Sequence, residues 1–416
     1  MKIGAARGSA LYIGALIGPG LLLIPALAVE AAGPASILAW IGLLVLSAPL
    51  ALTFAALAVR YPVAGGVSAY VRAGLGDAAA AVTGAWFVAA ILVGAPAVSL
   101  MGGYYVADLT GSGPGVAVGV ALAMLATVVA TNALGLRVSS STQLVLSSVL
   151  VVVLSVAIAV ALPEVDAGHF RPFAPKGWWA VGTAANILIW LFIGWEAVAQ
   201  LVGDFRRPAL DLPRAMGVAF AVVSVLYVGL AVVTVGVTSG SGSKVPLADL
   251  MEVGFGRIGR DVTAVLAVAL TMGTMNVYMA GGAKLAVALA EGGALPRWLR
   301  DATGRSVPLR PLACFALAGG MLLVVLAAGW LNVTDLIRAT SSLFVGVYVL
   351  AVASAVRILR GRARIAAVTA VVMVTMIAFF SGWYIAVPAI AAALSLLQLA
   401  WSRRLETKHR SISTLT

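Results

Sequence analysis

Charge, cysteine and histidine are all scarce in this sequence. Charged residues make up 10% of its 416 residues, whereas a soluble domain carries about 25%. Cys314 is the only cysteine, which excludes an intramolecular disulfide and a metal site made of several cysteines. The two histidines, His169 and His409, fall in predicted loops. We therefore expect no metal site and no cofactor, and the low charge argues against a soluble protein.

Apolar residues take the place of the missing charges. They make up 62% of the chain, and the mean hydropathy is +1.08. Runs of about 20 apolar residues, the length that lets a helix cross a bilayer, recur along the whole sequence. A membrane β-barrel would instead show short segments of alternating polarity. The sequence therefore predicts an all-α polytopic membrane protein.

The apolar runs predict 12 transmembrane helices. We interpret the first run as a helix rather than a removed signal, because no small-residue cleavage site follows a short apolar core. The predicted spans are 9–32, 35–59, 79–108, 114–134, 141–162, 178–203, 213–238, 260–290, 309–330, 335–356, 364–381 and 384–402.

The basic residues predict the orientation in the membrane. A net charge of +12 would suggest a nucleic-acid partner in a soluble protein, but here the basic residues lie in short loops, so we expect none. With the N-terminus inside, 21 of the 27 lysines and arginines fall on the cytoplasmic side and 6 outside, as the positive-inside rule requires. We expect a multi-pass protein of the cell (plasma or inner) membrane, with both termini cytoplasmic and its longer loops, 163–177 and 239–259, outside.

The first predicted span carries its own helix breakers. The stretch IGALIGPGLLLIP contains Gly18, Pro19 and Gly20 inside an apolar run. The sixth span is interrupted in a similar way by Gly194 in WLFIGWEA, 175 residues after Pro19. Each interruption opens a block of five spans. Interrupted helices at matching positions of two halves are typical of transporters built from inverted repeats, with the substrate site at the breaks.

An unwound stretch in the membrane core leaves backbone groups unpaired, and a ligand can pair with them. A half-helix that begins at Leu21 offers free N–H groups and a positive dipole end to an anion. Gly18 and Gly20 let a ligand approach the backbone, and Pro19 suits a first helical turn. The alternative is that the glycines serve only close packing and that Pro25 only kinks the helix. The matching break in the sixth span favours the site.

Glu196 is the acidic residue placed deepest in any predicted span. A charged carboxylate inside the membrane costs on the order of 3 kcal/mol or more and is a functional candidate by default. In one interpretation it pairs with freed backbone N–H groups and holds the kink. In the other it carries a coupling proton. The two interpretations are compatible.

Polar residues of the eighth predicted span are secondary candidates. Asn276 and Tyr278 fall near its middle, and Lys284 lies nearer its cytoplasmic end. The lysine either reaches the interface or stays as a buried ion. Thr271 and Thr274 are the hydroxyls available for a sodium ion, but they fall toward the outer side. We therefore favour protons over sodium as the coupling ion.

Three motifs carry a resemblance to a known family. IGALIGPGLLLIP resembles the first-helix signature of the amino acid–polyamine–organocation transporter superfamily. The superfamily's sixth-helix motif and the loop after it resemble FIGWEAVAQLVGDFRRPALDLPRA. Its motif at span 8 and the loop that follows resembles ALAEGGALPRWL. The motifs occur in the family's order within the first ten spans. The short length and compact loops most resemble the bacterial exporter branch for methionine and branched-chain amino acids.

The resemblance implies a leucine-transporter-like fold, which is a five-plus-five inverted repeat with broken helices 1 and 6. Residues 1–357 would form the ten-helix transport core, with one repeat at 9–162 and the other at 178–357. Two peripheral helices would follow at 358–402, and the tail 403–416 would be cytoplasmic.

The resemblance also implies where substrate binds. The backbone of 18–21 would bind the substrate carboxylate, carbonyls of 192–194 would take its ammonium group, and Phe192 or Trp195 would gate the site. Pro19 departs from the family pattern, which has a small residue with an N–H there. The implied substrate-binding residues are Ile17, Gly18, Pro19, Gly20, Leu21, Phe192, Ile193, Gly194 and Trp195.

The sequence therefore predicts a secondary active transporter of neutral, apolar L-amino acids of the methionine, leucine, isoleucine and valine class. We expect it to export them by proton antiport through alternating access. An uptake permease or exchanger of the same superfamily is the alternative. A membrane enzyme is not supported, because the spans show no nucleophile–base pair or metal cluster. A channel is not supported either, because no ring of like charges or repeated filter sequence occurs.

Overall fold

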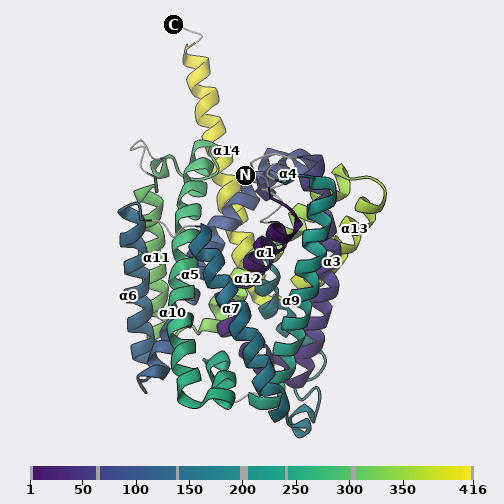
Figure 1. Ribbon diagram of the computed structural model, residues 1–416. Helices are drawn as coiled ribbons and strands as arrows, with labels where there is room; N and C mark the ends of the chain where they lie inside the picture. The colour runs from purple at the N-terminus through teal and green to yellow at the C-terminus, as the bar shows by residue number, and fades with distance from the viewer. Residues whose placement is uncertain are drawn as a thin grey trace.

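The computed structural model describes residues 3–61, 66–136, 140–196, 205–238, 242–300 and 306–413. Within these ranges the chain is helical and forms no strand, only an isolated bridge between Ile3 and Phe205. The helices run side by side as a bundle (Figure 1). The predicted all-α class is confirmed.

Most helices follow the predicted spans, but α10 begins earlier than predicted, and a short additional helix follows the second span. Two 3₁₀ helices, η1 (Pro19–Leu22) and η5 (Ile189–Phe192), matter for the site. The α-helices are α1 (Ala5–Leu16), α2 (Ile24–Ala32), α3 (Ser36–Arg60), α4 (Gly66–Leu75), α5 (Asp77–Leu109), α6 (Pro114–Ala133), α7 (Ser140–Ala161), α8 (Trp179–Leu188), α9 (Pro208–Thr238), α10 (Pro246–Glu291), α11 (Leu309–Ala327), α12 (Val333–Ile358), α13 (Arg362–Phe379) and α14 (Ala386–Ser413).

In the part of the chain that the structure describes, 10 stretches are long and apolar enough to cross a membrane. Large apolar side chains on them face outward, such as Leu52, which is 60% exposed, and Val225, which is 73% exposed. A soluble protein rarely exposes such a surface, so these side chains fit contact with lipid. The two other predicted spans do not run as single helices: α1 ends within 9–32, and 178–203 is described only to residue 196. The count of twelve stays a prediction.

Local chemistry explains where several helices begin. α12 starts with a capping box, in which the Asn332 side chain accepts from the Asp335 N–H and the Asp335 carboxylate accepts from the Asn332 N–H. α6 starts at Pro114, whose missing N–H costs little in a first turn. α13 follows Gly361, whose φ of 61° favours glycine.

The start of α10 differs from the sequence prediction of an outer loop at 239–259. The helix already begins at Pro246 and bends at Gly256, whose φ of 57° and ψ of −148° are not helical. Leu247 and Leu250 of this first segment are buried. The segment is helical because it has an apolar face to bury, which its polar neighbours in the sequence obscure.

α5 packs against α6, α10 and α12, and small residues allow the close contacts. A Cβ atom on Gly103 would lie 2.2 Å from the Ala117 carbonyl oxygen of α6. One on Gly102 would lie 2.6 Å from the Thr271 hydroxyl oxygen of α10. Close approach at small residues is the usual way for helices to associate in a membrane, where apolar burial gives no driving force between them.

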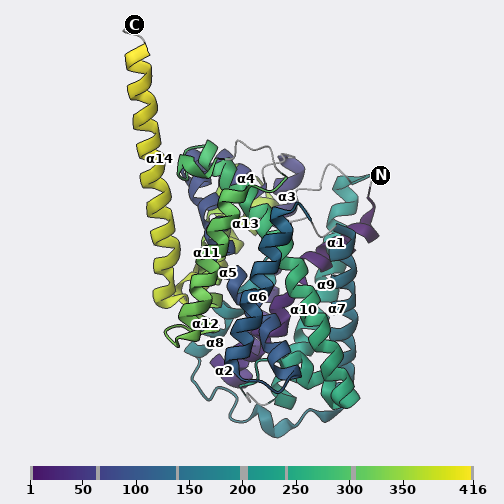
Figure 2. The ribbon, with the colours of Figure 1, turned by 90° about the vertical axis from the view of Figure 1, so that its left-hand side faces the viewer.

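The two chain ends lie at the same end of the bundle. α1 begins there, and α14 rises along the side of the bundle and projects beyond it (Figures 1 and 2). The loop after α7 lies at the opposite end (Figure 1). This arrangement fits the predicted placement of both termini on one side of the membrane.

Candidate functional site

The first junction, residues 17–23, separates α1 from α2. Ile17 (φ −93°, ψ 101°) and Gly18 (φ −135°, ψ −176°) are extended, and η1 then begins at Pro19. Proline has no N–H with which to continue a preceding helix, but its fixed φ suits the first position of a new one. The sequence therefore stops one helix and starts the next within a few residues.

In the part of the chain that the structure describes, two backbone N–H groups of the first junction have no hydrogen-bond partner. Those of Gly18 and Gly20 form no hydrogen bond within the described ranges, whereas the Leu21 N–H donates to the Gly18 carbonyl over 3.2 Å. A Cβ atom on Gly18 would meet no atom within 4 Å, so there is open space beside it. Unpaired N–H groups in a membrane interior are costly, and an anion is a suitable partner for them.

The second junction, residues 189–196, follows α8 and comprises η5 and the four residues after it. Ile193 is extended (φ −82°, ψ 129°), and Gly194 has a φ of 141°, which only glycine adopts readily. A Cβ atom on Gly194 would lie 2.9 Å from the Ala15 carbonyl oxygen of α1. Gly194 is therefore required both by its conformation and by its closeness to α1. The predicted second half of this span, 197–203, lies outside the described residues.

The two junctions lie against each other. A Cβ atom on Gly20 would lie 2.7 Å from Cδ2 of Leu191. The Tyr227 hydroxyl of α9 lies 2.8 Å from the carbonyl oxygens of both Leu16 and Leu191, near the ends of α1 and η5. A hydroxyl has one proton to donate, so Tyr227 shares it between the two. The predicted substrate-binding residues of spans 1 and 6 are thus brought together in space.

Glu196 is 8% exposed and its carboxylate stays within the second junction. One of its oxygens, Oε2, accepts from the Tyr348 hydroxyl over 2.5 Å and from the Gly194 N–H over 3.2 Å. The Gly194 N–H also lies 3.2 Å from the Tyr348 hydroxyl oxygen. The three groups form a closed triangle that ties the second junction to α12.

Sequence reasoning missed three buried tyrosines that hold the junctions: Tyr105, Tyr227 and Tyr348. Tyr105 of α5 donates to the Leu22 carbonyl over 2.8 Å, so each hydroxyl bonds a junction. The available signal was their position inside apolar spans, because a hydroxyl buried there needs a partner. The sequence does not show which carbonyl or carboxylate that partner is.

The two predicted gating residues lie in separate aromatic clusters. The ring centroid of Phe192 is 6.0 Å from that of Trp40 and 5.1 Å from that of Tyr227. The centroid of Trp195 is 6.1 Å from that of Tyr12. The indole N–H of Trp195 and the Tyr12 hydroxyl are buried and have no hydrogen-bond partner among the described residues. Such groups cost about 1–3 kcal/mol each, so the Trp195 cluster is the less satisfied of the two.

The secondary candidates are dispersed along α10. Tyr278 is 52% exposed, and its phenol interacts electrostatically with Glu196. Asn276 is buried, and its amide donates to the Thr131 hydroxyl over 3.2 Å, which joins α10 to α6. Lys284 is exposed, in keeping with a side chain that reaches the interface.

The hydroxyl groups of Thr271 and Thr274, the candidates for a sodium ion, form hydrogen bonds within the protein. Among the described residues, no three histidine, cysteine or acidic side chains gather closely enough to hold a metal ion. The Thr271 hydroxyl donates to the Ala267 carbonyl of its own helix over 2.8 Å. The Thr274 hydroxyl accepts from the Gln143 amide over 3.4 Å.

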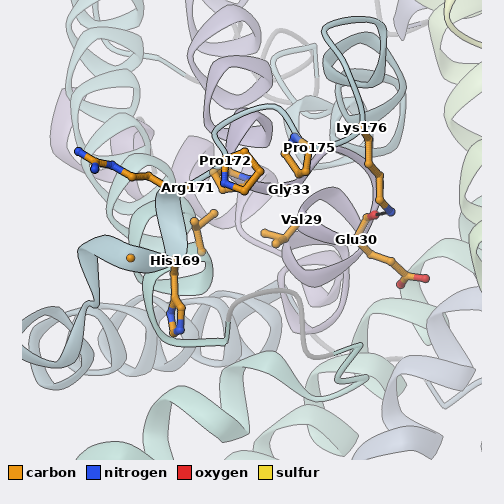
Figure 3. A pocket seen from close by; sticks show the side chains of 11 residues that line it. Val29, Glu30, Gly33, His169, Arg171, Pro172, Pro175 and Lys176 are labelled. Carbon is orange, nitrogen blue, oxygen red and sulfur yellow. Dashed lines mark hydrogen bonds between the residues drawn. The ribbon is translucent and has the colours of Figure 1, made fainter.

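A pocket of about 370 Å³ lies at the end of the bundle that carries the 163–177 loop (Figure 3). In it the loop packs on the end of α2. A Cβ atom on Gly33 would lie 2.7 Å from Cγ of Pro175, and the Lys176 amino group donates to the Glu30 carbonyl. The walls include no residue of either described junction, so this pocket belongs to the outer loop.

Comparisons with known proteins give the class of protein. A family profile described as amino acid permease matches residues 4–402. YecA of Bacillus subtilis, described as an uncharacterized amino acid permease, is 34% identical over 394 residues, which are 93% of this chain and 92% of that one. The L-methionine/branched-chain amino acid exporter YjeH of Escherichia coli is 28% identical over 389 residues, 92% of each chain. The branched-chain amino acid permease BcaP of Bacillus subtilis is 27% identical over 254 residues, 57% of this chain and 55% of that one.

Proposed function

The chain belongs to the amino acid permease family, and we propose that it is a secondary active transporter of neutral, apolar L-amino acids of the methionine, leucine, isoleucine and valine class. The related proteins are transporters rather than enzymes. The activity to explain is therefore the movement of an amino acid across the membrane. The residues of the two junctions are the candidates for binding that amino acid.

The contact between the two junctions is the observation that carries this proposal. At the first, the unpaired N–H groups of Gly18 and Gly20 suit a carboxylate. At the second, η5 ends at Phe192, and the carbonyl oxygens of Phe192 and Ile193 are placed to suit an ammonium group in this proposal. An α-amino acid carries both charged groups on one carbon, so one ligand that spans the junctions pairs with all of these backbone groups.

The side chains around the junctions favour a neutral and apolar substrate. Ile17, Leu21 and Trp195 are apolar or aromatic and lie at the junctions. The carboxylate of Glu196 is bonded to Tyr348 and Gly194, so it does not offer a free partner for a cationic side chain. The names of YjeH and BcaP, which refer to branched-chain amino acids, support the same substrate class.

For the architecture we propose 12 spans arranged as a five-plus-five inverted repeat, with the first and sixth helices discontinuous. The repeats are 9–162 and 178–357, followed by peripheral helices within 358–402 and the tail 403–416. The matching position of the two junctions supports this arrangement. The excess of basic residues on the side that holds α1 and the end of α14 supports cytoplasmic termini in the cell membrane.

In this proposal the aromatic clusters act as gates during alternating access. The cluster of Trp195 and Tyr12 lies on the α1 side of the junctions, and the cluster of Phe192 and Trp40 lies on the side of α3. One cluster stays packed while the other opens, so the substrate never meets an open pore.

We propose that protons drive export, with Glu196 as the proton carrier. Its carboxylate is the described acidic group that touches a junction, and protonation would remove its negative charge and so weaken the hydrogen bonds that Tyr348 and Gly194 donate to it. The exporter name of YjeH favours export. Uptake or exchange is the alternative, which the permease names of YecA and BcaP favour.

Counterflow in proteoliposomes tests this function. Vesicles loaded with unlabelled leucine should accumulate labelled methionine, leucine, isoleucine and valine, but not lysine or glutamate. An imposed pH gradient should drive net movement, and replacing sodium by potassium should change nothing. Accumulation of labelled lysine in place of leucine would overturn the substrate class. Sodium-dependent net movement without a response to pH would overturn the proton assignment.

A further inference from the structure

A second pocket, of about 400 Å³, opens at the end of the bundle where α1 begins. α3, α9 and the start of α13 enclose it, and Figure 1 shows these helices together along one side of the bundle. No residue of the described junctions lines it. Its walls include Ala55, Ala56, Val59, Leu212, Arg60 and Arg360.

Two arginines give this pocket its charge. Arg60 ends α3 and Arg360 lies between α12 and α13; both are exposed, and neither forms an ion pair or hydrogen bond within the described ranges. Asp211 neighbours the wall, but it is buried and accepts from the Arg207 N–H over 3.1 Å at the start of α9. Even with Asp211 counted, the pocket keeps a net positive charge and two guanidinium groups free to bind.

The rest of the wall is apolar and continues onto the surface that faces lipid. Ala55 and Ala56 are small and leave room beside α3. Val59 is 49% exposed, Leu52 lies about two turns earlier on the same helix, and Ile365 of α13 is 67% exposed. An apolar strip therefore runs from the arginines along α3 and α13. A free inorganic anion gains nothing from contact with this apolar strip, whereas an acyl chain can pack against it.

We propose that this pocket binds an anionic phospholipid. The guanidinium groups of Arg60 and Arg360 hold the phosphate, because arginine donates paired hydrogen bonds to phosphate oxygens. The acyl chains lie along the apolar strip. Basic pockets between transmembrane helices at headgroup level are suited to anionic headgroups. The leaflet, cytoplasmic here, rests on the proposed topology, but the binding itself does not rest on the proposed transport activity.

Native mass spectrometry of the full chain in a neutral detergent tests the site. The protein is titrated with phosphatidylglycerol, with phosphatidylcholine of the same acyl chains, and with glycerol phosphate. We expect phosphatidylglycerol to bind tightly, phosphatidylcholine weakly and glycerol phosphate not at all. Arg60→Gln with Arg360→Gln should weaken phosphatidylglycerol binding roughly 30-fold, because each arginine near an anionic lipid contributes about a factor of five.

A matched control removes two exposed positive charges at the same end but outside the pocket, by Arg7→Gln with Arg404→Gln, and should leave binding unchanged. Ala56→Trp keeps both arginines and fills the apolar part, so it should also weaken phosphatidylglycerol binding. Equal binding of the two lipids, or an equal loss in both arginine pairs, would overturn the proposal. Competition by glycerol phosphate would show a site for a small anion instead. Because this experiment measures lipid binding and not transport, a failed counterflow assay does not affect the lipid proposal. Likewise, absence of lipid binding does not affect the proposed transport function.

Discussion

At the second junction the Gly194 N–H lies 3.2 Å from both the Glu196 carboxylate and the Tyr348 hydroxyl oxygen, whereas at the first junction the N–H groups of Gly18 and Gly20 have no partner within the described ranges. Both segments are glycine-containing and lie inside the same bundle. In the second, Glu196 and Tyr348 of α12 pair with the Gly194 N–H, whereas in the described part of the chain the first leaves two N–H groups without a partner.

This difference suggests a division of labour between the junctions. A segment with unpaired N–H groups gains from any anionic ligand, because the ligand removes a desolvation cost. A segment that is already bonded gains nothing from a ligand at those groups, but its bonding changes when its carboxylate takes up a proton. The N–H groups of the first junction are therefore suited to binding a carboxylate, and the carboxyl of the second is suited to coupling, beside the carbonyl oxygens proposed for the ammonium group. A proton at the second junction affects transport only by favouring one conformation over another.

The largest effect is expected from Gly194→Ala. The new Cβ would lie 2.9 Å from the Ala15 carbonyl oxygen, and the φ of 141° is strained for any other residue, at about 1–3 kcal/mol for the strain alone. We expect a lower melting temperature and loss of all transport, measured by thermal unfolding in detergent and by counterflow. The control is Gly217→Ala in α9, where a Cβ would meet no atom within 4 Å. Equal stability of the two variants would contradict the geometry of the second junction.

The next largest effect separates ligand binding from packing at the first junction. Gly20→Val should abolish transport while the protein remains inserted and monodisperse. The side chain it meets first is Leu191, at 2.7 Å from the new Cβ, and the end of a leucine can shift. Gly42→Val, in open space on α3, is the matched control and should keep transport.

A double variant distinguishes two roles of Gly20, close packing against Leu191 and access of a ligand to the Gly20 N–H. Leu191→Ala added to Gly20→Val removes the closest contact of the new side chain and leaves only Cδ1 of Ile24, at 3.1 Å from the new Cβ, which can shift. If Gly20 served only packing between the junctions, transport would return. We expect it to stay lost in inserted, monodisperse protein, because the new side chain also covers the Gly20 N–H, which has no partner among the described residues. Counterflow and melting temperature of the two variants decide between these outcomes.

The sequence alone predicts the helix ends at the first junction, and it does so for a local reason. Pro19 and the glycines around it stop and start helices through their own backbone chemistry, so no distant residue is needed. Gly194 and Glu196 are visible for the same reason, since a glycine and a carboxyl stand out in an apolar run. What the sequence shows is therefore where the backbone is interrupted.

How each interruption is satisfied could not be predicted, because the partners come from distant helices. Tyr348 lies 152 residues after Glu196 in the chain, and Tyr227 lies 36 residues after Leu191. A tyrosine in an apolar span has many carbonyls within reach of its helix, and only the packing selects one. The pocket that contains Arg60 could not be predicted from the sequence for the same reason, because its walls come from α3, α9 and the α12–α13 connection.

A smaller and more selective effect is expected from Glu196→Gln. Glutamine keeps the shape and accepts from Tyr348 and Gly194 as the carboxylate does, but it cannot change protonation state. Exchange of unlabelled for labelled substrate should persist, while net transport driven by a pH gradient is lost and the pH dependence of binding flattens. Both are measured in the same proteoliposomes.

Two outcomes would give Glu196 another role. If exchange and pH-driven transport fall together, Glu196 only clamps the second junction. If both persist with an unchanged pH dependence, the coupling ion uses another path. Tyr348→Phe is the matched variant, because it removes one hydrogen bond to the carboxylate, worth about 1.5–3 kcal/mol for a charged acceptor, but keeps the titrating group. It should lower thermal stability and retain a response to pH.

The smallest effect is expected from Pro19→Ser. Serine fits the space of proline and supplies a third N–H beside those of Gly18 and Gly20, so the first junction would offer the carboxylate one more donor. The cost is the added freedom of the unfolded chain, about 0.4–1 kcal/mol. We expect near-normal transport with equal or lower KM in counterflow. Loss of transport with an unchanged melting temperature would show that the missing N–H of Pro19 itself matters, for instance by keeping substrate bound loosely enough to be released. That result would reverse the comparison between the junctions, since the open backbone of the first would then be tuned for release rather than for binding.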